Sequence, residues 1–487
     1  MKRALTVLLA ATFVAGMAPL SRAQDKPYNA PSYNEFDRGL TIYKGDKMAL
    51  DIWGRGQMIG VGQYVSEPVK GASNERIYEF LKQARLGFNG KYEDLFNYQI
   101  EMALGGENQN SSQSSAGGYD LTDFVADVPV KALGENTIIK LGQFRVPYGR
   151  EALGDEGYQD FSDRSIANLA TNHGRDFGLA IMGTHDKFTG TIGTFPDGGR
   201  DIAQRYLPEL FGIPEIVARV GYNDGVDADI YHVMGTDRKL TRDTKAFFVN
   251  GLFERDTRIG HSSSLQSHGV DTNLLSDKNY NPYFDRSNNS SGLCSANTCE
   301  RGSLWNVGAD AVYRHPMGNN QALEFEGQAD WAGYSNRFGT LHIASARGQA
   351  DYQAGSWEIG ARYAVLSMDS HAGFFTAAAA PPAGETVTSA SVGGGRQWTP
   401  GMGKPIHEIT PAITYHFRGH TMKVVADLPI YLDCPTIIAA NDGSYVFADQ
   451  GGASPGWDQI QAADAGLGSS MVRRTSVEAR MMFQWQF

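Results

Sequence analysis

The sequence predicts an all-β protein, a transmembrane antiparallel up-and-down barrel of sixteen strands, and three observations support this. First, apolar and polar residues alternate over segments of about ten residues, the length that a tilted strand needs to cross a bilayer. Second, short turns alternate with long loops rich in Gly, Ser, Asn and Pro, as on the two sides of an outer membrane. Third, the mean hydropathy of −0.35 is too polar for a helical membrane protein but suits half-polar strands.

The N-terminal residues 1–23 are predicted to be a cleaved signal peptide. A basic start precedes the apolar stretch 4–18, and Ala23 ends a small-residue cleavage motif. An uncleaved membrane anchor is the alternative. Residues 24–45 show no sustained period and are predicted to form an extended lead-in. No run of eighteen apolar residues follows, so no transmembrane helix is expected.

The barrel is predicted to occupy residues 46–487, with an even number of strands because both ends lie on the periplasmic side. The segment 227–235 also alternates. Counting it as a spanning strand would move the long segment 256–302 to the periplasmic side, so we interpret it as a turn, with eighteen strands as the alternative. The sixteen predicted strands are residues 47–64, 79–90, 95–104, 119–131, 137–146, 175–184, 188–195, 214–223, 245–255, 303–314, 321–333, 341–353, 356–367, 405–417, 420–432 and 471–487.

Strand length favours a barrel over a β-sandwich, because sandwich strands average only about six residues. The long connections 256–302, 368–404 and 433–470 are predicted to be extracellular loops.

The last strand alternates up to the terminal Phe487. Since a barrel has no free edge, this strand is predicted to pair with the first. Met481, Phe483, Trp485 and Phe487 would then face lipid, and Glu478, Arg480, Gln484 and Gln486 would face the lumen.

Charge and cysteine content narrow the functional classes. The net charge of −11 makes an exported nucleic-acid-binding protein unexpected, because phosphate neutralisation requires basic surface. Cys294 and Cys299 lie close together in a polar loop, and an oxidising compartment favours a disulfide between them, with a metal site as the alternative. Cys434 has no predicted disulfide partner.

No motif for a cofactor, a resident metal or catalysis stands out, so neither a cofactor nor an enzyme is expected.

Several segments resemble the phosphate-selective porins O and P of bacterial outer membranes. The resemblance is dense over residues 80–200 and patchy over residues 300–487. The segments that carry it are LKQARLGFNGKYEDLFNYQIEMAL (81–104), IKLGQFRVPYGREAL (139–153), FSDRS (161–165), GRDFGL (174–179), WEIGARYAVLSMD (357–369) and the closing SVEARMMFQWQF.

The resemblance implies a sixteen-stranded homotrimeric channel in the outer membrane, with loop 147–174 folded into the lumen. It implies passive diffusion of small hydrophilic solutes, with phosphate or other anions drawn in by lumenal arginines. The terminal Phe487 resembles the closing aromatic that the barrel assembly machinery recognises, and outer-membrane lipid would surround the barrel. The residues that match the family's motifs are Arg85, Arg145, Arg150, Arg164 and Arg175.

The predicted lumen carries charges of both signs, which argues against strong anion preference because fixed charge decides which ions enter a pore. The infolded loop is mixed as well, and charges paired across strands could instead form a structural salt-bridge network. Nine basic residues face the lumen: Arg85, Arg145, Arg219, Arg314, Arg347, Arg362, Lys423, Arg474 and Arg480. Twelve acidic residues do so: Glu101, Asp123, Asp127, Asp310, Glu324, Glu326, Asp330, Asp351, Glu358, Glu408, Asp427 and Glu478.

The sequence therefore predicts an outer-membrane porin. One alternative is a barrel that sheaths an electron-transfer cytochrome or another partner. Another is an outer-membrane enzyme or adhesin that works through the loops 256–302 and 433–470. The candidate pore-lining and solute-binding residues are Arg85, Arg145, Arg150, Arg164, Arg175, Glu101, Asp123, Arg347, Arg362 and Arg480.

Overall fold

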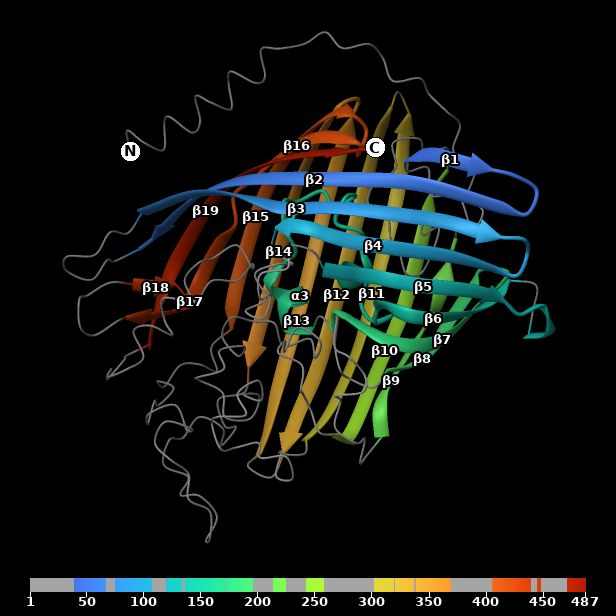
Figure 1. Cartoon of the computed structure of the whole chain (residues 1–487). Helices are drawn as coiled ribbons and strands as arrows, with labels where there is room; N and C mark the ends of the chain where they lie inside the picture. The colour runs from blue at the N-terminus through green and yellow to red at the C-terminus, as the bar shows by residue number, and fades with distance from the viewer. Residues whose placement is uncertain are drawn as a thin grey trace.

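The strands of the computed structural model close into one antiparallel barrel (Figure 1). The structure describes residues 39–66, 75–106, 120–133, 136–171, 173–195, 213–224, 242–257, 302–318, 320–336, 339–368, 405–438, 445–447 and 471–487. Its strands are β1 Leu40–Lys44, β2 Met48–Val65, β3 Glu75–Tyr92, β4 Phe96–Gly106, β5 Asp120–Pro129, β6 Thr137–Arg145, β7 Arg175–His185, β8 Phe188–Phe195, β9 Ile213–Asn223, β10 Thr244–Thr257, β11 Gly302–Gly318, β12 Gln321–Asn336, β13 Gly339–Ala354, β14 Trp357–Met368, β15 Ile406–Arg418, β16 Met422–Asp427, β17 Ile430–Ile438, β18 Tyr445–Phe447 and β19 Met471–Gln486.

Sixteen barrel strands confirm the predicted count. Strands β2 to β15 supply fourteen, β16 and β17 together form the fifteenth, and β19 closes the ring against β2. Two short strands are additional. β1 lies within the predicted lead-in and pairs with β2, and β18 pairs with the end of β17 inside the predicted loop 433–470. The alternating segment 227–235 lies outside the described residues, as do the predicted signal peptide, Cys294 and Cys299.

Where their side chains are described, the sixteen barrel strands have a largely apolar outer face and a largely polar inner face. In β19 and the residue that follows it, Trp485 and Phe487 are exposed, whereas Glu478, Arg480 and Gln484 are buried. The exposed large side chains on other strands include Phe124, Ile192, Phe247, Trp331 and Ile359. This outward apolar belt fits contact with lipid, since a closed barrel satisfies all its backbone hydrogen bonds internally. None of the helices described is long and apolar enough to cross a membrane.

The seam between β19 and β2 confirms the predicted closure. The two strands pair in continuous register from Ser476 opposite Val65 to Gln486 opposite Arg55. The ladder continues past the strand end, where the Phe487 N–H donates to the Gly54 carbonyl at 3.0 Å. The indole of Trp485 packs over Gly56, where the ring leaves no room for a Cβ atom.

Residues 147–171 and 173–174, between β6 and β7, fold into the lumen; we call them the infolded loop. It contains two short helices, α2 Arg150–Leu153 and α3 Ile166–Thr171, and α3 lies against β13 and β14 (Figure 1). A third short helix, η2 Lys131–Leu133, lies in the turn between β5 and β6.

Backbone and side-chain hydrogen bonds attach the infolded loop to distant parts of the wall. The Tyr148 hydroxyl lies 2.6 Å from Asn306 Oδ1 on β11 and 2.9 Å from Asp330 Oδ1 on β12. The Ser162 and Ile166 N–H groups donate to Asp427 and Glu408, each at 2.7 Å. Wall carboxylates thus hold the loop at several points along its length.

Candidate functional site

The infolded loop and the facing wall line an open cavity of about 50 Å³ inside the barrel. Its lining combines basic and acidic groups of both the wall and the loop. Arg347 and Arg362 come from β13 and β14, and the loop contributes Asp155 and Asp160. The remaining lining residues are Arg150, Glu151, Gly154, Tyr158, Gln159, Phe161, Asp163, Glu326 and Gln349. A solute passing the loop would meet both signs of charge at this point.

Glu156 of the infolded loop lies among four arginines, which we call the Glu156 cluster. Its carboxylate oxygens are 2.6 Å from Arg85 Nη2, 2.8 Å from Arg164 Nη1, 3.4 Å from Arg145 Nη2 and 3.9 Å from Arg55 Nη2. Burial alone would raise the pKa of Glu156, but Arg85, Arg164 and Arg145 hold it well below its ordinary value. This carboxylate is therefore charged and locked in place.

Strand register brings the Glu156 cluster together. Arg55 on β2 lies directly opposite Arg85 on β3, and both point inward by the period-two rule. Arg85 also contacts Glu101 of β4, with 2.5 Å between Nη1 and Oε1. Arg175, at the start of β7, pairs with Asp123 at 3.1 Å and lies 3.6 Å from Glu101. These contacts link six of the ten candidate residues, namely Arg85, Arg145, Arg164, Arg175, Glu101 and Asp123.

A second group of three candidate residues lies around α2. Arg347 Nε is 3.2 Å and Arg362 Nη1 is 3.6 Å from the carboxylate of Glu151. Arg150 pairs with Glu326 at 2.8 Å, and Arg347 shares that same carboxylate at 2.9 Å. Arg362 also pairs with Glu408 and lies over the ring of Phe161.

The tenth candidate, Arg480, lies apart from both groups. It donates to Glu478 on its own strand and, at 2.9 Å, to the Tyr431 hydroxyl. All eight candidate arginines thus have a carboxylate partner. The inner wall therefore contains a salt-bridge network. Such a network was the alternative to arginines that bind solute.

Three basic lumenal residues were not anticipated from the sequence. Arg55 and Lys140 lie on the inward faces of β2 and β6, where the alternation could have revealed them. Lys82 could not have been found in this way. A register shift at Gln57/Met58 of the β2–β3 ladder places Lys82 and its neighbour Gln83 both inside, and Lys82 reaches Asp163 of the infolded loop at 3.2 Å.

A third group is acidic and lies where the infolded loop meets the hairpin of β13 and β14. It contains Asp160 of the loop with Asp351 and Glu358 of the wall, and we call it the carboxylate trio. Burial raises the pKa of Asp160 well above its ordinary value, and the charges of Glu358 and Asp351 raise it further.

The family model of the phosphate-selective porins O and P matches residues 59–204, which confirms the predicted resemblance over that segment. No curated protein sequence matches the chain. A solved anion-selective porin from Comamonas acidovorans has 12% identity and a TM-score of 0.51, over 90% of this chain and 100% of that chain. At this identity, the likeness shows the barrel fold.

Two further solved structures are also similar in outline. OprB of Pseudomonas putida, at high pH, has 10% identity and a TM-score of 0.47, over 90% of this chain and 94% of that chain. OmpT of Vibrio cholerae has 11% identity and a TM-score of 0.45, over 91% of this chain and 99% of that chain.

Proposed function

We propose that this chain is an outer-membrane porin of the phosphate-selective O and P type, through which small hydrophilic solutes diffuse passively. The observation that carries the proposal is a closed sixteen-stranded barrel with an apolar outer belt and a charged loop folded into its lumen. The match of residues 59–204 to that family includes this loop. Passage requires no chemical step, so the proposed activity is that of a channel rather than an enzyme.

The paired charges at the constriction support weak rather than strong ion preference. Glu156 offsets part of the positive charge of its arginines, and Asp155, Asp160 and Asp163 line the cavity together with Arg347 and Arg362. Because charges of both signs are interspersed there, neither anions nor cations are strongly favoured. Phosphate transport is suggested by the family resemblance alone.

The infolded loop also bears on the alternative of a barrel that sheaths another protein. Loop residues contact β11, β12, β15 and β16, so they occupy lumen that an enclosed cytochrome would need. This disfavours the sheath.

A homotrimer remains part of the proposal on the strength of the family resemblance, and chemical cross-linking in native outer membranes would test it.

Single-channel recording in planar bilayers under a KCl gradient tests the proposed function. We expect stepwise conductance with a reversal potential close to zero, because charges of both signs line the constriction. Absence of conductance from correctly folded protein would contradict the porin. A strongly chloride-selective reversal potential would contradict weak ion preference while leaving the porin intact.

A further inference from the structure

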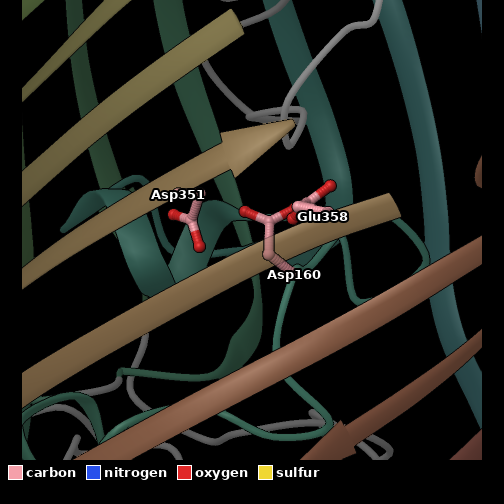
Figure 2. Close-up of side chains that lie close together, drawn as sticks. All are labelled: Asp160, Asp351 and Glu358. Carbon is pink, nitrogen blue, oxygen red and sulfur yellow. The ribbon is translucent and has the colours of Figure 1, made fainter. Parts of the chain in front are cut away.

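Asp160, Asp351 and Glu358 form a buried acidic site with too little positive charge around it. Figure 2 shows the three side chains together, one from the infolded loop and two from the hairpin of β13 and β14. One oxygen from each lies within 4.8 Å of the others, and the side chains are only 5%, 3% and 2% exposed. Three carboxylates this close in a buried place repel one another unless a cation or protons neutralise them.

The trio has fewer basic partners than the other acidic groups of the constriction. Glu151, Glu156 and Asp163 each form an ion pair with an arginine or lysine. Asp160 and Asp351 form no ion pair with any residue that the structure describes, and the ion-pair partner of Glu358 is His416 at 3.0 Å. Lys423 lies near enough to interact electrostatically with Asp160 and Glu358 but forms no ion pair with either, and its ammonium donates to the Gln159 carbonyl.

One oxygen of each carboxylate is held by a neighbouring side chain, and the other is not. Gln349 Nε2 donates to Asp160 Oδ2 at 3.2 Å and to Asp351 Oδ2 at 2.7 Å. Gln353 Nε2 donates to Glu358 Oε2 at 3.1 Å, beside the contact from His416. The buried oxygens Asp160 Oδ1, Asp351 Oδ1 and Glu358 Oε1 accept no hydrogen bond from a neighbouring donor, although Asp160 and Glu358 lie close enough to share a proton. Buried oxygens without partners are costly, so this arrangement calls for a ligand.

The surroundings are suited to a metal ion. Around metal sites, neighbouring donors commonly hold one carboxylate oxygen and leave the other for the ion. Gly360 lies opposite Asp351 in the ladder, and a Cβ atom at this position would collide with Asp351 Oδ1. A glycine here leaves room for that oxygen. Asp160 also lines the lumenal cavity, which gives an ion a path from solution.

We propose that the carboxylate trio binds one divalent cation, and that Ca²⁺ fits it better than Mg²⁺. Carboxylate oxygens are the ligands that these two hard cations prefer. Ca²⁺ accepts about six to eight oxygen ligands in a flexible geometry, whereas Mg²⁺ needs near-ideal octahedral geometry and usually keeps several waters. A buried site whose three side-chain oxygens come from two separate segments and lie within 4.8 Å of one another suits the more adaptable ion. Bound Ca²⁺ would tie the middle of the infolded loop to the β13–β14 hairpin and remove negative charge from the constriction.

The test uses full-length protein refolded in detergent without lipopolysaccharide, since lipopolysaccharide itself binds Ca²⁺. After treatment with EDTA, CaCl₂ or MgCl₂ is titrated in by calorimetry, and the unfolding temperature is measured with and without CaCl₂. We expect one Ca²⁺ per chain, binding at least tenfold tighter than Mg²⁺, and a higher unfolding temperature in CaCl₂. Asp351→Asn and Glu358→Gln should each abolish both effects. Asp127→Asn, which removes a lumenal carboxylate outside the trio, should keep them.

Two results would overturn the proposal. One is wild-type protein that neither binds Ca²⁺ nor is stabilised by it. The other is Ca²⁺ binding that survives in both trio variants, which would place the ion elsewhere. If the trio is instead neutralised by protons, both variants should be more stable than wild type in EDTA and CaCl₂ should change nothing. If one of the two trio variants fails to fold, the other variant alone provides the test. The outcome does not depend on which solute the channel passes.

Discussion

At the scale of single residues, Glu156 organises the constriction. One loop carboxylate meets arginines from β2, β3, β6 and the loop itself. It therefore attaches the infolded loop to the wall and also reduces the positive charge that a passing ion meets. The same side chain affects stability and selectivity, and the two effects can be measured separately.

Replacing Glu156 with glutamine should shift ion preference toward chloride. One unit charge about 8 Å away across water contributes about 0.5 kcal/mol for each ion, with opposite sign for chloride and potassium, so the chloride-to-potassium permeability ratio should rise about sixfold. Reversal potentials in a KCl gradient would measure this. Asp243→Asn removes the same charge from an exposed residue outside the constriction and should leave the ratio unchanged. An unchanged ratio in Glu156→Gln would mean that solutes do not pass this cluster.

The depressed pKa of Glu156 predicts how its contribution to stability varies with pH. A carboxyl group whose pKa is lower in the folded state stabilises the fold above its unfolded pKa, here the ordinary 4.5, and loses this as pH falls through the folded value. The difference in unfolding temperature between wild type and Glu156→Gln should therefore stay constant from pH 8 to about pH 5 and shrink at lower pH. A difference that shrinks between pH 8 and 6 would contradict the lowered pKa.

At the scale of elements, the infolded loop is held at its start by Tyr148. Its hydroxyl contacts Asn306 on β11 and Asp330 on β12, all within the buried lumen. Tyr148→Phe leaves these oxygens without this contact, which costs about 1–3 kcal/mol. We expect a loosened loop, seen as larger fluctuations in open-channel current. Tyr363→Phe removes a hydroxyl contact on the exposed outer face and should leave the current unaltered.

The seam between β19 and β2 offers a matched pair of substitutions. At Gly56 a Cβ atom would collide with the Trp485 ring, whereas at Gly62, further along β2, the nearest atom is 4.0 Å away. Gly56→Ala should lower the unfolding temperature, since overpacking costs about 1–3 kcal/mol, and Gly62→Ala should change it little. Gel electrophoresis of samples heated to increasing temperatures would measure unfolding, because the folded and unfolded forms of a barrel migrate at different positions. Equal effects from the two variants would mean that Trp485 does not hold the seam.

The sequence predicted the strands well and the constriction poorly, for one physical reason. Alternation is local, so the ends of strands such as β8 and β12 were predicted to within a few residues. The Glu156 cluster depends on which residues of separate strands lie opposite one another, and pattern alone does not reveal this. The shift at Gln57/Met58 turns Lys82 inward, and a second at Ala84/Arg85 changes the register with β4. The carboxylate trio joins a loop to a hairpin and was likewise not foreseen.

At the scale of the whole molecule, the network of paired charges links the infolded loop to distant strands of the barrel wall. Contacts of the infolded loop reach β2 and β3 and also β11 and β12, which lie about halfway round the ring from them. A change at one wall can therefore reach the opposite wall through the loop. This is why substitutions at the constriction are expected to alter stability and conductance together.

The seam has a further consequence, for the order of events in folding. Gln57 and Gln484 are hydrogen-bonded across it although 427 positions separate them along the chain. The ring cannot close until the last residues have been delivered, and contacts so distant in sequence form slowly because the entropy of a very long loop is lost first. Until then both edges of the sheet expose backbone groups that would pair with other chains. A chain of this design has to be kept apart from its copies throughout its passage from export to insertion.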